Sequence, residues 1–180
     1  MTREEEIRRV ARETIREMEA ERGRGADVAI GADHGGFELK ERLRRYIAEE
    51  LGRSVVDCGA YSADAVDYPD VAAEVARRVA AGEAPRGILI DGAGIGSSMA
   101  ANKISGIRAA VCHDEKTVRN SREHNNANVL CLGSGTVRVG EARRLTRIWL
   151  NTPFAGGRHA RRVDKIDALD RRRGGEGENS

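Results

Sequence analysis

The residues most capable of chemistry in this chain stand in short glycine-rich stretches that follow apolar runs. Asp33 and His34 precede a pair of glycines, and Asp91 opens the stretch Asp-Gly-Ala-Gly-Ile-Gly-Ser, which ends at Ser97. A carboxylate can remove a proton beside a carbonyl group, and an imidazole can move protons between oxygens. Backbone amides of glycine loops can hold an oxyanion or a phosphate. These residue types indicate acid–base chemistry on an anionic substrate.

Further polar residues come later in the chain. His124 and Asn125 stand in the stretch Glu-His-Asn-Asn, and residues 158–162 read Arg-His-Ala-Arg-Arg. Guanidinium groups suit phosphate because they form paired hydrogen bonds with it. Each feature also has an ordinary structural explanation: Asp91 could cap a following helix, and the arginine run could be a solvated helix face. Their convergence on one edge of a sheet would favour a functional site.

The elements that must position these residues are apolar runs alternating with amphipathic stretches. Strands are predicted at 28–30, 54–58, 87–90, 109–112 and 128–132, and helices at 37–51, 71–81, 96–103, 115–123, 137–150 and 161–169. Continuously apolar strands that alternate with helices are typical of a parallel sheet covered on both faces. The pattern therefore predicts an α/β domain with a five-stranded parallel sheet, whose ligands sit beyond the carboxyl ends of the strands.

Length and composition exclude several classes of protein. A chain of 180 residues predicts one domain with short appendages. With 31 basic and 29 acidic residues, the net charge of +2 leaves no basic surplus for nucleic acid. No apolar run reaches the roughly 18 residues of a membrane span. Three cysteines without metal-ligand spacing indicate reduced thiols in the cytoplasm.

The chain divides into three predicted parts: an amphipathic helix with a hinge at 1–26, a globular body at 27–170 and a flexible polar tail at 171–180. In the first part, Ile7, Val10, Ala11, Ile15 and Met18 form one apolar stripe. This helix could pack on its own domain or on a sister subunit. Alternatively, residues 3–20 could dock into a groove of a partner. The pattern resembles the encapsulation peptides that tether enzymes inside bacterial microcompartments.

Seven blocks of the body, in order, carry a family resemblance. They begin with Ala-Asp-His-Gly-Gly-Phe-Glu-Leu-Lys at 32–40 and include Asp-Tyr-Pro at 67–69, Gly-Ala-Gly-Ile-Gly at 92–96, Arg-Glu-His-Asn-Asn-Ala-Asn at 122–128 and Gly-Arg-His at 157–159. Together they resemble the family of ribose-5-phosphate isomerase B and the galactose-6-phosphate isomerase subunits. The resemblance covers residues 27 to about 170 and leaves residues 1–26 outside.

The resemblance implies a Rossmann-like three-layer α/β/α domain that interconverts aldose and ketose phosphates through an enediolate, without metal or cofactor. The default pair is ribose 5-phosphate and ribulose 5-phosphate. It also implies a homodimer or homotetramer with sites at the subunit interface. By matching motifs, Asp33 and His34 bind sugar and phosphate, and Tyr68 lines the sugar pocket. The remaining implied roles are ring opening by His124, enediolate support by Asn125, phosphate binding by Arg158 and Arg162, and an oxyanion cradle in the loop of Gly92, Gly94 and Gly96.

The chain departs from the family pattern at the proposed catalytic position. Asp91 stands where most members have a cysteine base, and Ser97 stands where some members have a glutamate. Ala93 replaces a threonine or serine, and Gly135 replaces an arginine that commonly follows the last strand. We expect Asp91 to be the base, with Ser97 beside it. The departures leave two alternatives open: an isomerase for an altered sugar phosphate, and a non-catalytic sugar-phosphate-binding homologue.

Overall fold

The apolar runs of the sequence form one parallel sheet. The structure, a computed structural model, describes residues 25–175. The strands lie in the order β2-β1-β3-β5-β4, which places β3 at the centre of the sheet. Their bounds are β1 Val28–Ala32, β2 Val55–Asp57, β3 Gly87–Asp91, β4 Ala109–Val111 and β5 Val129–Gly133.

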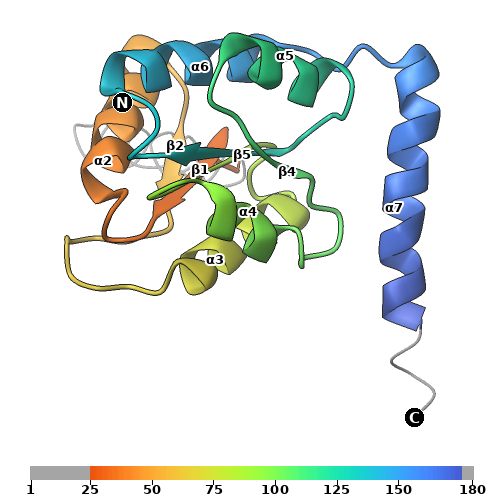
Figure 1. Cartoon of the computed structure of the whole chain (residues 1–180), viewed down its shortest axis with the longest axis horizontal. Helices are drawn as coiled ribbons and strands as arrows, with labels where there is room; N and C mark the ends of the chain where they lie inside the picture. Colours follow the sequence, from red (N-terminus) through yellow and green to blue (C-terminus); the bar gives the residue numbers. More distant parts are fainter. Residues whose placement is uncertain (1–24, 176–180) are drawn as a thin grey trace, which may run out of the picture.

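Helices cover both faces of this sheet, so the predicted three-layer α/β/α architecture is confirmed (Figure 1). Helices α2, α5 and α6 pack on one face and α3 and α4 on the other, each group with its own cluster of buried side chains. The helices are α2 Phe37–Arg45, α3 Tyr68–Ala80, α4 Ile95–Ala101, α5 Glu115–Glu123, α6 Val139–Asn151 and α7 Ala160–Gly175. A π-helical turn, Tyr46–Glu50, continues α2, and a 3₁₀ turn, Gly157–His159, precedes α7.

The core consists mainly of Val, Ile, Leu and Ala side chains, as the low aromatic content predicts. All three cysteines, Cys58, Cys112 and Cys131, are free and buried, which confirms the expected reduced thiols. Burial raises the pKa of Cys58 to about 11. These thiols are therefore packing residues rather than nucleophiles.

The carboxyl-terminal helix is longer than the sequence predicts. We expected a helix at 161–169 and a flexible tail from residue 171, whereas α7 runs to Gly175. The predicted helix at 1–22 and residues 176–180 of the tail lie outside the described residues. None of the helices between residues 25 and 175 is long and apolar enough to cross a membrane.

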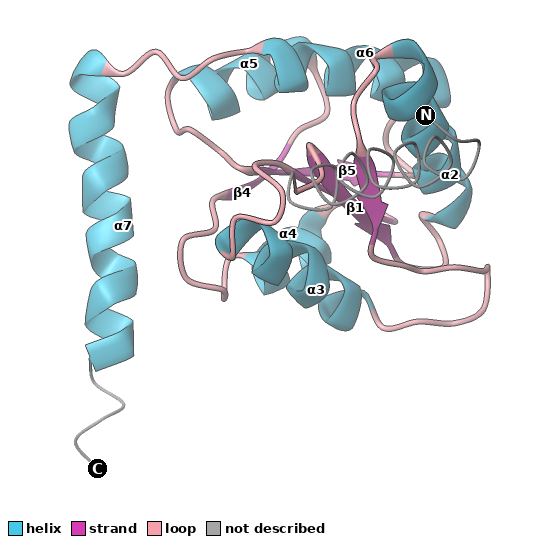
Figure 2. Ribbon diagram, turned by 180° about the vertical axis from the view of Figure 1, so that it is seen from behind, coloured by secondary structure: helices cyan, strands magenta, loops and turns pink. Residues whose placement is uncertain are grey.

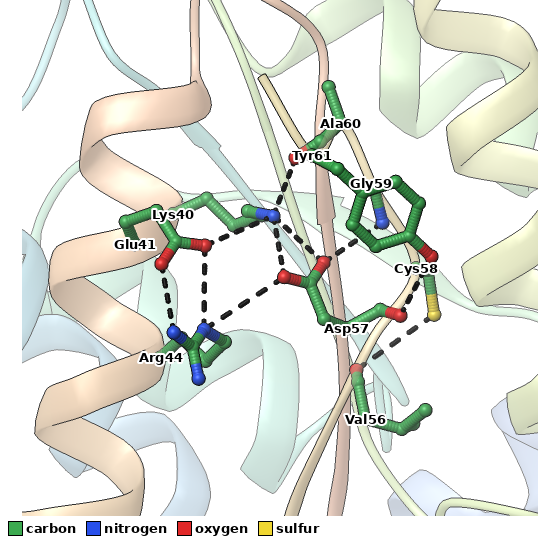
Figure 3. A network of polar contacts seen from close by, with 9 residues as sticks. All are labelled: Lys40, Glu41, Arg44, Val56, Asp57, Cys58, Gly59, Ala60 and Tyr61. Atoms are coloured by element: carbon green, nitrogen blue, oxygen red, sulfur yellow. Dashed lines mark hydrogen bonds and ion pairs between the residues drawn. The ribbon is translucent and has the colours of Figure 1, made fainter. Parts of the chain in front are cut away.

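A buried lysine joins α2 to the end of β2 (Figure 3). The side chain of Lys40 is fully buried, and its ammonium group donates hydrogen bonds to both carboxylate oxygens of Asp57, at 2.8 and 2.7 Å. It also donates to the carbonyl oxygen of Ala60 at 2.6 Å, while Asp57 accepts the amide N–H of Gly59 at 2.9 Å. This network fixes the segment that leaves β2 against the helix that begins beside the candidate site.

Candidate functional site

The glycine loop begins where β3 ends, at Asp91, and leads into α4. Gly94 adopts a positive φ of 78°, a backbone conformation that glycine tolerates without strain. The loop after β5 is tied to it, because the amide of Ser134 donates to the Asp91 carbonyl at 2.8 Å and that of Gly135 to the Gly92 carbonyl at 3.0 Å. Two neighbouring strand ends thus form one connected surface.

The Asp91 carboxylate turns into its own loop and is only 5% exposed. It accepts hydrogen bonds from the amides of Ala93 and Ser97, both at 2.8 Å, and from the amide of Gly94. Burial acts to raise the pKa of Asp91, but the side chain and backbone of Ser97 and the amides of Gly94 and Ala93 together lower it. Asp91 is therefore ionised at neutral pH, and it engages amides that the sequence predicted to be an open oxyanion cradle.

Asp33 and His34 lie beside the end of β3. The amide of Asp33 donates to the carbonyl of Ile90 at 3.1 Å, and its carboxylate accepts the amide of Gly36 at 2.8 Å. A Cβ atom at Gly36 would lie 2.5 Å from the Ile90 carbonyl oxygen, so only glycine allows this approach. His34 is exposed at the surface of the same turn. These residues thus share the carboxyl edge of the sheet with Asp91.

Tyr68 also belongs to this edge, because α3 begins there. Its ring packs on Gly96, where an added Cβ atom would lie 2.7 Å from two ring carbons. The side chain remains 41% exposed. Tyr68 therefore packs against the glycine loop at the carboxyl edge.

His124 and Asn125 lie at the opposite edge, which corrects the expected convergence on one sheet edge. They follow α5 and precede β5, and a helix that connects parallel strands returns the chain to their amino ends. The rings of His124 and His159 stack with 4.1 Å between centroids and 5° between planes. The amide of Ala155 donates to the carbonyl of Glu123 at 3.0 Å, so the segment after α6 joins the end of α5.

The arginines of the expected phosphate clamp lie at this amino edge too. We expected Arg158 and Arg162 on one helix face, with His34 near them either in the same chain or across a subunit interface. Instead, Arg158 belongs to the 3₁₀ turn and Arg162 to α7. Helices α2 and α7 stand at opposite ends of the molecule, so within one chain His34 is remote from both arginines (Figures 1 and 2). Helix α6 carries the chain away from the carboxyl edge, so of the two alternatives only a contact across a subunit interface remains.

His159 lies beside the predicted site residues, although motif matching gave it no role. It is buried and stacks on His124. Burial first, and then the charges of His124, Arg158 and Arg162, lower the pKa of His159. The sequence did offer a signal for this residue, because His159 is the last residue of the Gly-Arg-His motif at 157–159.

The predicted residues thus form two half-sites in one chain. The carboxyl half-site holds the carboxylates, the glycine loop and Tyr68. The amino half-site holds the two histidines, Asn125 and the two arginines. Between residues 25 and 175, no group of three or more His, Cys, Asp or Glu side chains is arranged to hold a metal ion.

Comparison with known proteins identifies the family to which this chain belongs. The family model described as Ribose/Galactose Isomerase matches residues 28–166. Ribose-5-phosphate isomerase B of Escherichia coli is 44% identical over 146 residues, covering 81% of this chain and 97% of the relative. D-erythrulose-4-phosphate isomerase 2 of Mycolicibacterium smegmatis is 44% identical over 129 residues, or 71% of this chain and 85% of that one.

Solved structures agree with this assignment. Ribose-5-phosphate isomerase B of Clostridium thermocellum matches with a TM-score of 0.79 and 46% identity, covering 81% of this chain and 97% of that one. The enzyme from Thermotoga maritima matches with a TM-score of 0.77 and 45% identity, covering 79% and 98%. Because the family model spans most of the chain and these relatives align over nearly their whole length, this chain belongs to the Ribose/Galactose Isomerase family and is a sugar-phosphate isomerase.

Proposed function

We propose that this protein interconverts ribose 5-phosphate and ribulose 5-phosphate, with Asp91 as the base. The observation that carries the proposal is an ionised carboxylate at the end of β3, beside Asp33 and Tyr68, at the edge where α/β sheets bind ligands. Relatives named ribose-5-phosphate isomerase B share more than two-fifths of their residues with this chain.

The hydrogen bonds of Asp91 suggest how charge moves during the reaction. The carboxylate removes the proton from the carbon beside the carbonyl, and the negative charge passes to the oxygens of the enediolate. Once protonated, Asp91 holds the amides of Gly94 and Ser97 less strongly. These donors are then available to the enediolate oxygen, so stabilisation follows the charge. Ser97 serves here through its amide.

We further propose that the complete site forms between two copies of the chain. His124, for ring opening, and Asn125, for the enediolate oxygens, stand at the edge opposite Asp91, so a second copy must bring them to it. The same copy supplies Arg158 and Arg162 for the phosphate. Exposed apolar side chains beside the glycine loop support this arrangement, since Ile95 and Met99 are 52% and 64% exposed. A homodimer is the smallest assembly that satisfies it, and a homotetramer contains such pairs.

A different sugar phosphate is the second candidate substrate. The relative named D-erythrulose-4-phosphate isomerase 2 is as similar in identity as the ribose-5-phosphate isomerase B of Escherichia coli. Asp91, Ala93, Ser97 and Gly135 are the positions at which this chain departs from the usual pattern. Recruitment to a bacterial microcompartment by residues 3–20 stays a prediction, because these residues lie outside the described part of the chain.

Proton exchange in deuterium oxide tests the function directly. The full-length protein is incubated with four-, five- and six-carbon aldose and ketose phosphates, and deuterium at the carbon beside the carbonyl is followed by NMR. We expect exchange and isomerisation to be fastest with ribose 5-phosphate. Faster exchange with another sugar phosphate would identify that compound as the preferred substrate and contradict the assignment of ribose 5-phosphate. Binding of sugar phosphates without any exchange would favour the non-catalytic homologue.

A further inference from the structure

Asn120 lies on α5 one helical turn before His124, and the two residues are joined twice. The main-chain amide of His124 donates to the carbonyl oxygen of Asn120 at 3.0 Å, as in any helix. The side chains also meet, because Asn120 Nδ2 lies 2.8 Å from His124 Nδ1. None of the matched motifs contains Asn120, so motif matching assigned it no role. The structure thus adds a side-chain partner to a proposed site residue.

A contact with Asn125 determines which atom of the Asn120 amide faces the histidine. Asn125 Nδ2 lies 3.5 Å from the main-chain carbonyl oxygen of Asn120, which can only accept, so this end of Asn125 is the donor. The same Nδ2 donates to Asn120 Oδ1 at 3.2 Å. With Oδ1 turned to Asn125, Asn120 presents its NH₂ group to His124 Nδ1. Nδ1 therefore accepts, and the hydrogen of the neutral imidazole lies on Nε2.

The His124 ring is held on one face and at Nδ1, which leaves its Nε2 edge available. His159 stacks on the ring with 4.1 Å between centroids. Within residues 25–175, no group forms a hydrogen bond with His124 Nε2. The titratable and charged groups on the elements packed here are Arg158 and His159 from the 3₁₀ turn and Arg162 from α7. None of them is a hydrogen-bond acceptor for Nδ1, so the contact with Asn120 determines the tautomer.

Buried Arg122 fixes the main chain of this segment independently. It is only 2% exposed and donates to Asn126 Oδ1 at 2.9 Å and to the carbonyl oxygen of Ala127 at 2.6 Å. These bonds hold the turn after α5 without any contribution from Asn120, whose side chain is exposed. A substitution at Asn120 should therefore change how the His124 side chain is held and leave the fold intact.

We propose that Asn120 is a positioning residue that fixes His124 in the tautomer with its hydrogen on Nε2 and holds Asn125 beside it. The inference rests on the proposed function for the role of His124 in ring opening. In that step the bond between the anomeric carbon and the ring oxygen breaks, and the proton of the anomeric hydroxyl is transferred to the ring oxygen. The Nε2–H group donates a hydrogen bond to the ring oxygen and stabilises the negative charge that develops there. Because the neutral ring carries this hydrogen, donation persists as pH rises.

Heteronuclear NMR of the full-length protein, with its histidines labelled, measures the tautomer without requiring turnover. A ring nitrogen that carries a hydrogen differs in chemical shift from a bare one, and the His124 signals are those lost in His124→Gln. At about pH 9, where histidine side chains are ordinarily neutral, we expect the hydrogen on Nε2 in the unmodified protein. In Asn120→Asp we expect it on Nδ1, because a carboxylate can only accept. Hydrogen on Nδ1 in the unmodified protein, or the same tautomer in both proteins, would overturn the proposal.

Arg119→Gln is the matched control. Arg119 is an exposed residue of α5 whose side chain pairs with Glu115. Its replacement makes the same helix more negative by one charge, as Asn120→Asp does, without touching the amide that faces His124. The control should keep the hydrogen on Nε2, and circular dichroism verifies that all variants are folded. A change of tautomer in Arg119→Gln would show a general charge effect and overturn the proposal.

The pH dependence of turnover is the second measurement. Between about pH 7 and pH 9, kcat should stay level in the unmodified protein and in Arg119→Gln. In Asn120→Asp it should fall by about 10²-fold as pH rises, because the neutral ring then leaves Nε2 bare and one donor is lost. Parallel profiles in all three proteins would overturn the positioning role. If the unmodified protein isomerises no sugar phosphate, the proposed function fails, while the NMR result still decides whether Asn120 fixes the tautomer.

Discussion

At the scale of single residues, the environment of Asp91 keeps its carboxylate ionised before substrate binds. Three amides hold its carboxylate, and they lower its pKa although burial opposes them. A base must be deprotonated when substrate binds, and this one stays so well below neutral pH. A low pKa also reduces the driving force for proton removal, so the site depends on the release of the amides during the reaction.

Replacing Asp91 with Asn removes the basicity and keeps the shape. We expect Asp91→Asn to lower kcat by about 10²–10⁴-fold, the usual contribution of a proton-transfer group, while KM changes little. Steady-state kinetics on the preferred substrate measure this, and thermal unfolding verifies that the glycine loop is intact. Turnover near the unmodified level would place the base at another residue.

The buried Lys40 explains a second residue-scale effect, on stability. Lys40→Met leaves the Asp57 carboxylate without its ammonium partner and should lower the free energy of unfolding by roughly 2–4 kcal/mol. The double variant Lys40→Met/Asp57→Asn removes the unpaired charge and keeps an acceptor for the Gly59 amide. It should be more stable than Lys40→Met alone in urea denaturation. Equal or lower stability of the double variant would contradict the ion-pair explanation.

His159 predicts how stability changes with pH. Its pKa in the folded protein is lowered, so the unfolded chain binds the proton more readily. The stabilisation is therefore complete above the ordinary histidine pKa of about 6.5 and is lost as pH falls below it toward the folded value. The melting temperature should fall more between about pH 7.5 and pH 5.5 in the unmodified protein than in His159→Gln. Parallel curves would show that another group controls this range.

At the scale of elements, the sequence predicted the positions of strands and loops better than the spatial arrangement of the side chains that they carry. Val, Ile and Leu runs located all five strands, and the glycines after β3 located the loop with Asp91 at its start. The sequence could not show that the Asp91 carboxylate turns inward, because that depends on the spacing of the Ala93, Gly94 and Ser97 amides in three dimensions. The sequence also could not show at which edge of the sheet His124 lies, because that depends on the direction in which α5 runs.

The segment before the domain gives an element-scale prediction. The family match begins at residue 28 and β1 at Val28, so deletion of residues 1–22 should leave the folded body and its turnover nearly unchanged. Thermal unfolding and isomerase kinetics measure both. The deletion should abolish recruitment to a shell or other partner in a co-purification assay. A large fall in melting temperature would instead indicate that this segment packs on the domain.

At the scale of the whole molecule, the chain separates its chemistry onto two remote edges of one sheet. Asp33, Tyr68 and Asp91 occupy the carboxyl edge, while His124 and the arginines occupy the amino edge beside the start of α7. Under the proposed assignment, another copy must complete the site before a sugar can be bound and deprotonated. The family resemblance implied this sharing, and the separation of the half-sites gives it a physical reason.

Complementation between two inactive variants tests this central claim most directly. Asp91→Asn and Arg158→Ala copies are unfolded, mixed in equal amounts and refolded, and isomerase activity is measured. Random pairing makes mixed dimers with one intact site each, so we expect about one quarter of the unmodified activity. As a control, Asp91→Asn mixed with His34→Ala should recover none, because both changes lie in the same half-site and damage every site. A mixture of Asp91→Asn and Arg158→Ala that stays inactive, although mixed dimers form, would contradict a site shared between two copies.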